Sequence, residues 1–89
     1  MCHIYTSTPA KWYESTTRSV RIEGVVTSIR LENHFWQTLD QIAHEEGRST
    51  PKFLSELYRE VIEEKGQVDN FSSLLRVICS VHAQQALPA

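Results

Sequence analysis

The sequence has little of what builds a disulfide-rich, secreted or membrane-spanning protein. Its two cysteines, Cys2 and Cys79, stand at opposite ends of 89 residues and are too few for a disulfide scaffold, so we expect free thiols in a reducing compartment. No apolar run approaches the ~20 residues that span a bilayer, and no charged-then-apolar leader opens the sequence. These absences predict a cytoplasmic protein of one domain without a membrane segment.

Residues for catalysis or metal binding are also sparse. Three glycines leave no Gly-rich phosphate loop. His34, His44 and His82 lie at no recognised ligand spacing, so we expect neither a metal nor any other cofactor. Cys2 would become an N-terminal nucleophile if Met1 were removed, but enzymes of that kind need a large sheet sandwich, which this chain is too short to build. The sequence therefore predicts no enzyme.

The net charge of −2 argues against a non-specific nucleic-acid binder, but the charges are unevenly distributed. Between Glu32 and Asp69 the acids outnumber the bases, whereas the segment before it is basic. That segment carries Lys11, Arg18, Arg21 and Arg30 against Glu14 and Glu23. A basic segment on an acidic body can still bind DNA, because salt screens charges more than about 10 Å away.

Residues 18–31 are predicted to be extended. Val25, Thr27, Ile29 and Leu31 share one parity, and Val26, Ser28 and Arg30 share the other. Such alternation is typical of a strand with one buried face. Before Gly24 the parity is reversed, which a bulge or bend at Gly24 would reconcile. A chain reversal there is sterically awkward with one glycine, so we predict a single strand per chain and no internal repeat.

Three helices follow. The first begins at Glu32 or Asn33 and ends before Gly47, and the second begins at Ser49 or Thr50 and ends at Gly66. A third begins after Asp69 or Asn70. Their apolar stripes are Phe35, Trp36, Leu39, Ile42 and Ala43, then Phe53, Leu54, Leu57, Tyr58, Val61 and Ile62, then Phe71, Leu74, Leu75, Ile78 and Val81.

These stripes assign the remaining aromatic and sulfur side chains to the core. Phe35 and Trp36 could stack on single-stranded bases, but their place in a helical stripe favours the core. Cys79, between Ile78 and Val81 in the third stripe, is interpreted as a small apolar core residue.

A lone strand leaves its backbone N–H and C=O groups without partners. The simplest solution is a twofold homodimer in which the strand pairs with its own copy above a shared helical core. The third helix then either packs on its own dimer or joins two dimers into a tetramer, and the sequence leaves both open.

The residues themselves resemble a known family. The stretch Thr27-Ser28-Ile29-Arg30-Leu31-Glu32, then Phe35-Trp36, Leu39 and Ile42-Ala43, then Gly47-Arg48-Ser49, is similar to the core motif of ribbon–helix–helix proteins (the Arc/MetJ type). The Met1-Cys2 start, the segment 17–21 and the helix that begins at Asn70-Phe71 resemble a subgroup of small bacterial proteins with an extended form of this domain. The core likeness covers about half the chain, from Val25 to Lys65.

This resemblance implies a mainly α fold with one short strand per chain. Two chains would form an antiparallel two-stranded ribbon between subunits, and a third helix would be added at the C-terminus. The expected organisation is an N-terminal tail or arm at 1–17, a ribbon–helix–helix core at 18–65 and a C-terminal helix extension at 66–89.

The resemblance also implies a homodimeric transcriptional regulator that lays its ribbon in the major groove of double-stranded DNA. Carried over, the base-reading residues are Val26, Ser28 and Arg30. The phosphate-contacting residues at the start of the second helix are Arg48, Ser49, Thr50 and Lys52. Arg18 and Arg21 would form a basic arm.

Several alternatives stay open. Arg30 could instead pair with a cross-strand acid, and Arg18 and Arg21 could be ordinary solubilising charges. Glu32 stands where many members of the family have proline, which brings a negative charge close to the DNA surface. The rival function is a dimerisation or adaptor module that binds another protein without direct DNA readout.

Overall fold

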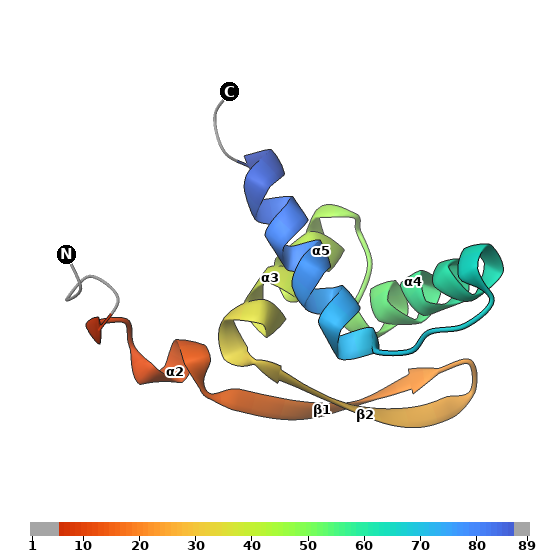
Figure 1. The fold of residues 1–89 in the computed structure, drawn as a ribbon, viewed down its shortest axis with the longest axis horizontal. Helices are drawn as coiled ribbons and strands as arrows, with labels where there is room; N and C mark the ends of the chain where they lie inside the picture. The colour runs from red at the N-terminus through yellow and green to blue at the C-terminus, as the bar shows by residue number, and fades with distance from the viewer. Residues whose placement is uncertain (1–5, 87–89) are drawn as a thin grey trace.

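The computed structural model describes residues 6–86 as a β-hairpin with helices packed on one of its faces. The elements in chain order are α2 (Ala10–Tyr13), β1 (Ser15–Ile22), β2 (Val25–Glu32), α3 (Asn33–Glu45), α4 (Thr50–Lys65) and α5 (Phe71–Ala86). In Figure 1 the hairpin runs along the lower side of the molecule, and α3, α4 and α5 lie above it. One face of the hairpin is therefore covered by the helices, while the other is left bare.

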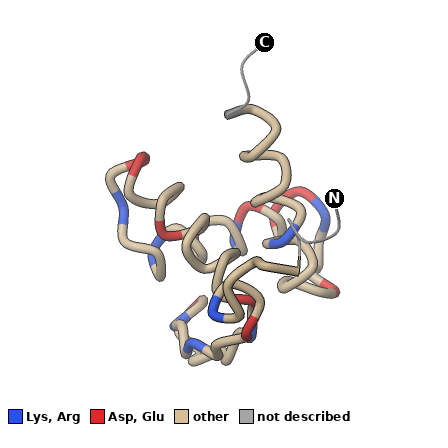
Figure 2. The backbone as a smooth tube through the Cα atoms, turned by 90° about the vertical axis from the view of Figure 1, so that its left-hand side faces the viewer, with Lys and Arg blue, Asp and Glu red and all other residues tan. Residues whose placement is uncertain are grey.

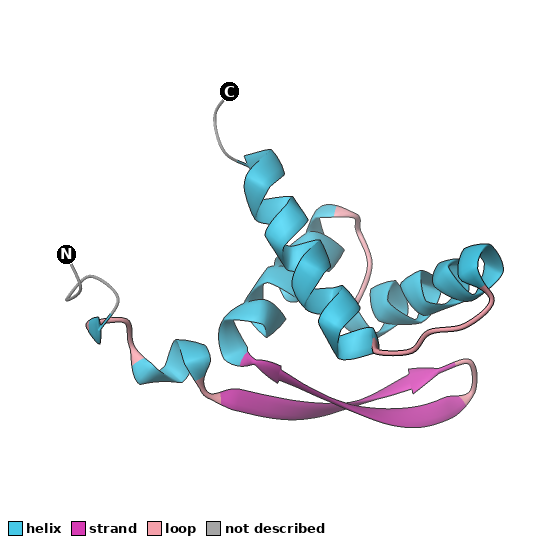
Figure 3. Cartoon of the chain, in the orientation of Figure 1, coloured by secondary structure: helices cyan, strands magenta, loops and turns pink. Residues whose placement is uncertain are grey.

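The ribbon is formed within one chain. β1 and β2 pair antiparallel along their whole length, from Ser15 opposite Glu32 to Ile22 opposite Val25, and the two strands twist strongly about each other (Figure 3). They are joined by Glu23 and Gly24, whose φ angles are 52° and 81°. Positive φ at both central residues is characteristic of the two-residue hairpin turn whose twist matches that of the strands.

The prediction of one strand per chain is therefore wrong. The parity reversal at Gly24 marks a change of direction, and residues 15–22 supply the second strand. Gly24 adopts the left-handed conformation freely, and Glu23 adopts it at a steric cost that the cross-strand pairing offsets. The backbone of β2 thus has a partner within its own chain, so pairing between two subunits is not needed to satisfy it.

The core lies between the hairpin and the three long helices. The hairpin contributes Val20, Ile22, Ile29 and Leu31. Ile29 and Leu31 are buried as the alternation predicted, whereas Val25 and Thr27, which share their parity, lie near the turn and are exposed. The helices contribute Trp36, Leu39, Ile42, Ala43, Phe53, Leu54, Leu75 and Cys79. Full burial of a Leu-sized side chain stabilises the fold by about 1.5–3 kcal/mol. Because α5 contributes Leu75 and Cys79, the C-terminal helix packs against this core.

Most of the predicted helix ends are confirmed. Ser49 caps α4, its hydroxyl accepting a hydrogen bond of 3.3 Å from the backbone N–H of Lys52. Gly47 and Gly66 have φ angles of 72° and 81°, as expected of residues that end helices. The apolar stripes are less well covered: Leu57, Tyr58, Val61 and Ile62 are half-buried, and Val81 is 44% exposed.

The segment expected to be an N-terminal tail is ordered where the structure describes it. The short helix α2 precedes β1, and β1 begins at Ser15, so the expected boundary at residue 17 falls inside a strand. Asn33 ties this segment to the start of α3: its side-chain amide donates to the Lys11 carbonyl over 2.8 Å, and its backbone N–H donates to the Glu14 carbonyl over 2.8 Å. Cys2 lies outside the described residues.

Candidate nucleic-acid interface

The bare face of the hairpin carries the base-reading residues predicted from the sequence. We call it the outer face; it consists of Thr17, Ser19 and Arg21 on β1 and Val26, Ser28 and Arg30 on β2, all exposed. Eight residues per strand span about 26 Å at roughly 3.3 Å each. A two-stranded ribbon fits the major groove, which is about 12 Å wide. The outer face therefore has the size and accessibility of a DNA-binding ribbon.

Arg30 is unengaged. Its cross-strand neighbour is Thr17, so the alternative in which Arg30 pairs with a cross-strand acid is wrong. Within residues 6–86, no hydrogen bond or ion pair involves the Arg30 side chain. Its guanidinium keeps all of its N–H donors for a ligand.

Arg21 and Arg18, which the sequence grouped as one basic arm, lie on opposite faces of β1. Arg21 is on the outer face, where one guanidinium nitrogen donates to the Gly24 carbonyl over 3.2 Å. Arg18 points toward the helices, 4.4 Å from the centre of the Trp36 ring. The two residues are part of a regular strand, so neither belongs to a loose arm.

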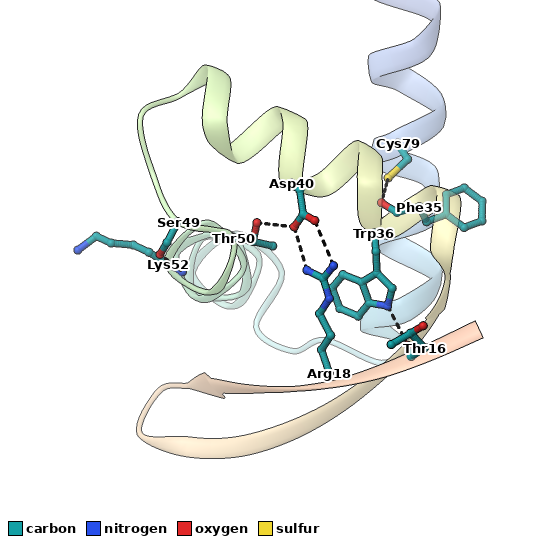
Figure 4. Close-up of polar contacts among 9 residues, drawn as sticks. All are labelled: Thr16, Arg18, Phe35, Trp36, Asp40, Ser49, Thr50, Lys52 and Cys79. Atoms are coloured by element: carbon teal, nitrogen blue, oxygen red, sulfur yellow. Dashed lines mark hydrogen bonds and ion pairs between the residues drawn. The ribbon is translucent and has the colours of Figure 1, made fainter. Parts of the chain in front are cut away.

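The Arg18 side chain is engaged by Asp40 on α3 (Figure 4). Two guanidinium nitrogens donate to the two carboxylate oxygens of Asp40 over 2.9 and 3.1 Å, and the Thr50 hydroxyl donates to the same carboxylate over 2.7 Å. The hydrogen bonds from Arg18 are the main cause of a lowered pKa at Asp40, and the bond from Thr50 adds to it, against the opposing effect of burial. Asp40 thereby connects the hairpin to the first turn of α4.

Trp36 reinforces this connection, and it is a core residue as expected. Its indole N–H donates to the Thr16 carbonyl over 2.8 Å, and its side chain is 2% exposed. A base cannot stack on a ring that is buried to this extent. The single-stranded stacking mode weighed from the sequence is therefore excluded for Trp36.

The first turn of α4 places the expected phosphate-contacting residues together but leaves few of them available. The Ser49 hydroxyl caps the helix and the Thr50 hydroxyl is bound to Asp40. Arg48 pairs with Glu56 over 2.6 Å and with Glu46 over 3.6 Å. Lys52 is the most accessible cation of the group, because its side chain is 70% exposed and its Nζ makes only a long contact of 4.0 Å with Glu56. The side chain extends away from the core in Figure 4.

The negative charge of Glu32, which seemed unfavourable beside DNA, is compensated. The Arg76 guanidinium on α5 donates to the Glu32 carboxylate over 3.0 Å. A hydrogen bond from its own backbone N–H, followed by the bond from Arg76, lowers the pKa of Glu32. In Figure 2 the hairpin is the lowest part of the molecule, and its basic and acidic residues are coloured along it. With Glu32 paired, the unpaired charge of the outer face is that of its arginines.

Apart from the outer face, the described residues include a hollow but no cluster of metal ligands. Within residues 6–86 there is no group of His, Cys, Asp or Glu side chains that could hold a metal ion. A hollow of about 300 Å³ lies among Lys11, Thr16, Arg18, Asn33, Trp36 and Gln37. The polar groups of Thr16, Asn33 and Trp36 are hydrogen-bonded within this set, and Arg18 is bound to Asp40. In the same stretch of chain, no helix is long and apolar enough to cross a membrane.

Comparison with known proteins identifies the family of this chain. The sequence model of the family described as "Ribbon-helix-helix domain" matches residues 15–83. The chain belongs to the ribbon–helix–helix domain family. Ribbon–helix–helix domains are a regulatory, non-enzymatic fold whose members are generally DNA-binding transcription regulators and typically bind DNA as dimers.

One solved structure is similar to this one along the whole chain. It is an uncharacterized protein from Bordetella pertussis Tohama I, with 36% sequence identity and a TM-score of 0.89 over all of this chain and 74% of that chain. Among the curated proteins, none matches this chain. The family match begins at Ser15, so it includes β1, which the sequence-based boundaries had divided between tail and core.

Thr17 and Ser19 on β1 are the outer-face residues that the sequence analysis missed; Arg21 was named, but as part of an arm. Val26, Ser28 and Arg30 were assigned from parity, but Thr17 and Ser19 were not singled out, because residues 1–17 were taken as a tail and no hairpin was expected. The signal was the apolar alternation of Val20 and Ile22, which has the opposite parity to that of β2. A parity reversal across a two-residue turn is what an antiparallel hairpin with one buried face requires.

Proposed function

We propose that this ribbon–helix–helix domain binds double-stranded DNA sequence-specifically through the outer face of its hairpin, inserted in the major groove, and that it is a transcriptional regulator. The observation that carries the proposal is Arg30, an exposed arginine on a bare two-stranded ribbon whose side chain forms no hydrogen bond or ion pair within residues 6–86. The family supports it, since its members are generally DNA-binding transcription regulators.

Each proposed base-reading residue on β2 suits a particular base edge. Arg30 can donate two hydrogen bonds to O6 and N7 of guanine, which is the commonest specific contact in the major groove. Ser28 can donate or accept, and Val26, 58% exposed, offers its methyl groups to the thymine methyl. The expected preference is therefore strongest at the base that faces Arg30.

Phosphate contacts are proposed at the start of α4. The N–H groups of a helix start attract anions, and Arg48, Ser49, Thr50 and Lys52 were expected to contact phosphate there. Because Arg48 is paired with Glu56 and the Thr50 hydroxyl is bound to Asp40, we assign the main charge contribution to Lys52. Ser49 contributes by capping the helix, which keeps that first turn in place.

The test is a selection from randomised duplex DNA followed by binding measurements at several salt concentrations. The wild-type protein is expected to enrich a motif, and Arg30→Ala is expected to lose preference for one guanine. Lys52→Ala should weaken binding to all sequences and reduce the slope of log K against log salt by about one. Arg59→Ala, an exposed arginine on α4, is the matched control. A wild-type protein that enriches nothing while folded would overturn the proposal.

A homodimer is proposed as the DNA-bound form, since domains of this family typically bind DNA as dimers. The intramolecular hairpin means that the second copy would add a second reading unit rather than complete the first. Association of dimers into a tetramer through α5 stays a prediction, with Val77 and Val81, 58% and 44% exposed, as the residues to substitute. Sedimentation of Val77→Ser/Val81→Ser beside the wild type would test it.

The second candidate is an assembly module in which α5 joins copies of this chain and DNA is not read. Exposed Val77 and Val81, together with the net charge of −2, favour it. Salt dependence separates the two functions, because DNA binding weakens steeply as salt rises whereas association through valines does not.

A further inference from the structure

The two strands of the hairpin have similar sequences. Residues 16–23 read TTRSVRIE, and residues 25–32 read VVTSIRLE. Ser19, Arg21 and Glu23 recur nine positions later as Ser28, Arg30 and Glu32, and most of the other positions hold side chains of similar size. The expectation of no internal repeat is therefore wrong; the repeat is short, and its importance is visible only through the strand pairing.

The strand register converts this repeat into a twofold relation. Ser19 lies directly opposite Ser28. Arg21 and Arg30 each lie two residues beyond these serines, in opposite directions along the ribbon. An axis perpendicular to the sheet, through the middle of the Ser19–Ser28 pair, therefore exchanges the two arginines and also exchanges Thr17 with Val26.

The buried face of the hairpin follows the same axis. The axis exchanges Val20 with Ile29 and Ile22 with Leu31, and all four side chains are 4% exposed or less. The relation fails at Arg18 and Thr27, where Arg18 is bound to Asp40 on α3. The axis thus describes the ribbon itself, while the helices lie asymmetrically on one of its faces.

We propose that β1 supplies a second base-reading row, Thr17, Ser19 and Arg21, so that one chain reads a short DNA element with twofold symmetry. This inference rests on the proposed function of the outer face. If Arg30 binds a guanine, the twofold equivalence places Arg21 to bind a second guanine on the other DNA strand. The ligand class is therefore a duplex element with two inverted guanines.

The spacing of these guanines follows from the register. Arg21 and Arg30 are four residues apart along the ribbon, which corresponds to about 13 Å at roughly 3.3 Å per residue. Base pairs stack about 3.4 Å apart, so the guanines should be separated by about four base-pair steps.

The surroundings of Arg21 are compatible with this role. Arg21 is exposed, and its cross-strand neighbour is Val26 rather than an acid. The 3.2 Å bond to the Gly24 carbonyl uses one of its nitrogens, and a guanidinium carries five N–H donors. The hydrogen bonds needed for guanine O6 and N7 are therefore still available. Arg18, by contrast, commits both terminal nitrogens to Asp40.

The experiment compares selections from randomised duplex DNA for the wild type, Arg21→Ala, Arg30→Ala and the control Arg59→Ala. The wild-type motif should contain two inverted guanines. Arg21→Ala should lose the preference at one of them and Arg30→Ala at the other, each with a loss of affinity of about 5- to 150-fold. Arg59→Ala should leave the motif and the affinity unchanged. Circular dichroism of each variant shows whether the fold is retained.

Arg21→Lys keeps the charge but lacks the planar fork that binds guanine at two points. If Arg21 reads a base, this variant should weaken the guanine preference, because a lysine donates to guanine with less defined geometry, while keeping most of the salt dependence. An unchanged motif in both Arg21 variants, with Arg30→Ala degraded, would overturn the second row and leave DNA reading by β2 intact. Failure of the wild type to enrich any motif would instead overturn the proposed function itself.

Discussion

The two-residue turn at Glu23 and Gly24 provides the sharpest test of the hairpin. Both residues have positive φ, a conformation that costs a non-glycine residue about 1–2 kcal/mol. Gly24→Ala should therefore lower the free energy of unfolding by about 1–2 kcal/mol. This cost is conformational, because a Cβ at Gly24 would meet nothing within 4 Å. Glu23→Asn should raise the free energy of unfolding by about 0.5–1 kcal/mol, since asparagine enters the left-handed region more readily.

Thermal unfolding at constant protein concentration measures both changes. For a domain of this size, 1 kcal/mol corresponds to a shift in Tm of about 4–8 °C. Gly66→Ala is a suitable reference, because Gly66 also has a φ of 81° and a Cβ there also meets no atom within 4 Å. It should be destabilising by a similar amount.

The same two substitutions would change the free energy of unfolding in the opposite directions if residues 18–31 formed one continuous strand. In an extended conformation, Gly24→Ala would stabilise by about 0.4–1 kcal/mol through the unfolded state. Glu23→Asn would destabilise, because asparagine is disfavoured in strands. A stabilising Gly24→Ala together with a destabilising Glu23→Asn would therefore refute the intramolecular hairpin.

Four further predictions concern the core and its connections. In a double-mutant cycle measured by urea unfolding, Arg18→Ala and Asp40→Ala should couple by about 0.5–1 kcal/mol, as for a half-exposed ion pair; additive effects would show that the pair does not hold the hairpin. Because the pKa of Asp40 is lowered, this stabilisation should be complete above the ordinary carboxyl range and be lost as pH falls through the lowered pKa, and an Asp40→Asn variant should lack this pH dependence. Burial raises the pKa of Cys79 to about 11, so a thiol reagent at pH 8 should label Cys79 only after denaturation. Rapid labelling of Cys79 in a native Cys2→Ser variant would contradict its burial. Leu39 is 0% exposed, so Leu39→Ala should lower the free energy of unfolding by about 2–5 kcal/mol. A decrease below 1 kcal/mol in urea unfolding would be inconsistent with the packed core.

Most of the fold could be predicted from the sequence because helical periodicity and capping residues are local signals. The stripe of α3 and the cap at Ser49 are found where they were expected. The hairpin could not be predicted in the same way. Its turn reads Glu-Gly instead of the Asn-Gly or Asp-Gly pairs that mark such turns, so the sequence lacked the usual signal for a reversal.

The candidate site was predicted in part. Parity alone assigned Val26, Ser28 and Arg30 to the face away from the core, and the strand register bears out that placement. The difference between Arg18 and Arg21 also follows from parity once the strand is known to begin at Ser15. The pairing of Arg18 with Asp40, and of Glu32 with Arg76, could not be read from the sequence, because the partners are 22 and 44 positions apart.

The covalent link between the two strands has an evolutionary consequence. In a ribbon assembled from two identical chains, every codon change alters both strands at once, so the surface stays symmetric and its target must change symmetrically with it. In this hairpin, Arg21 and Arg30 are encoded separately, as are Thr17 and Val26. One strand can therefore change by a single mutation while the other is kept, which allows the ribbon to follow a target whose two halves diverge.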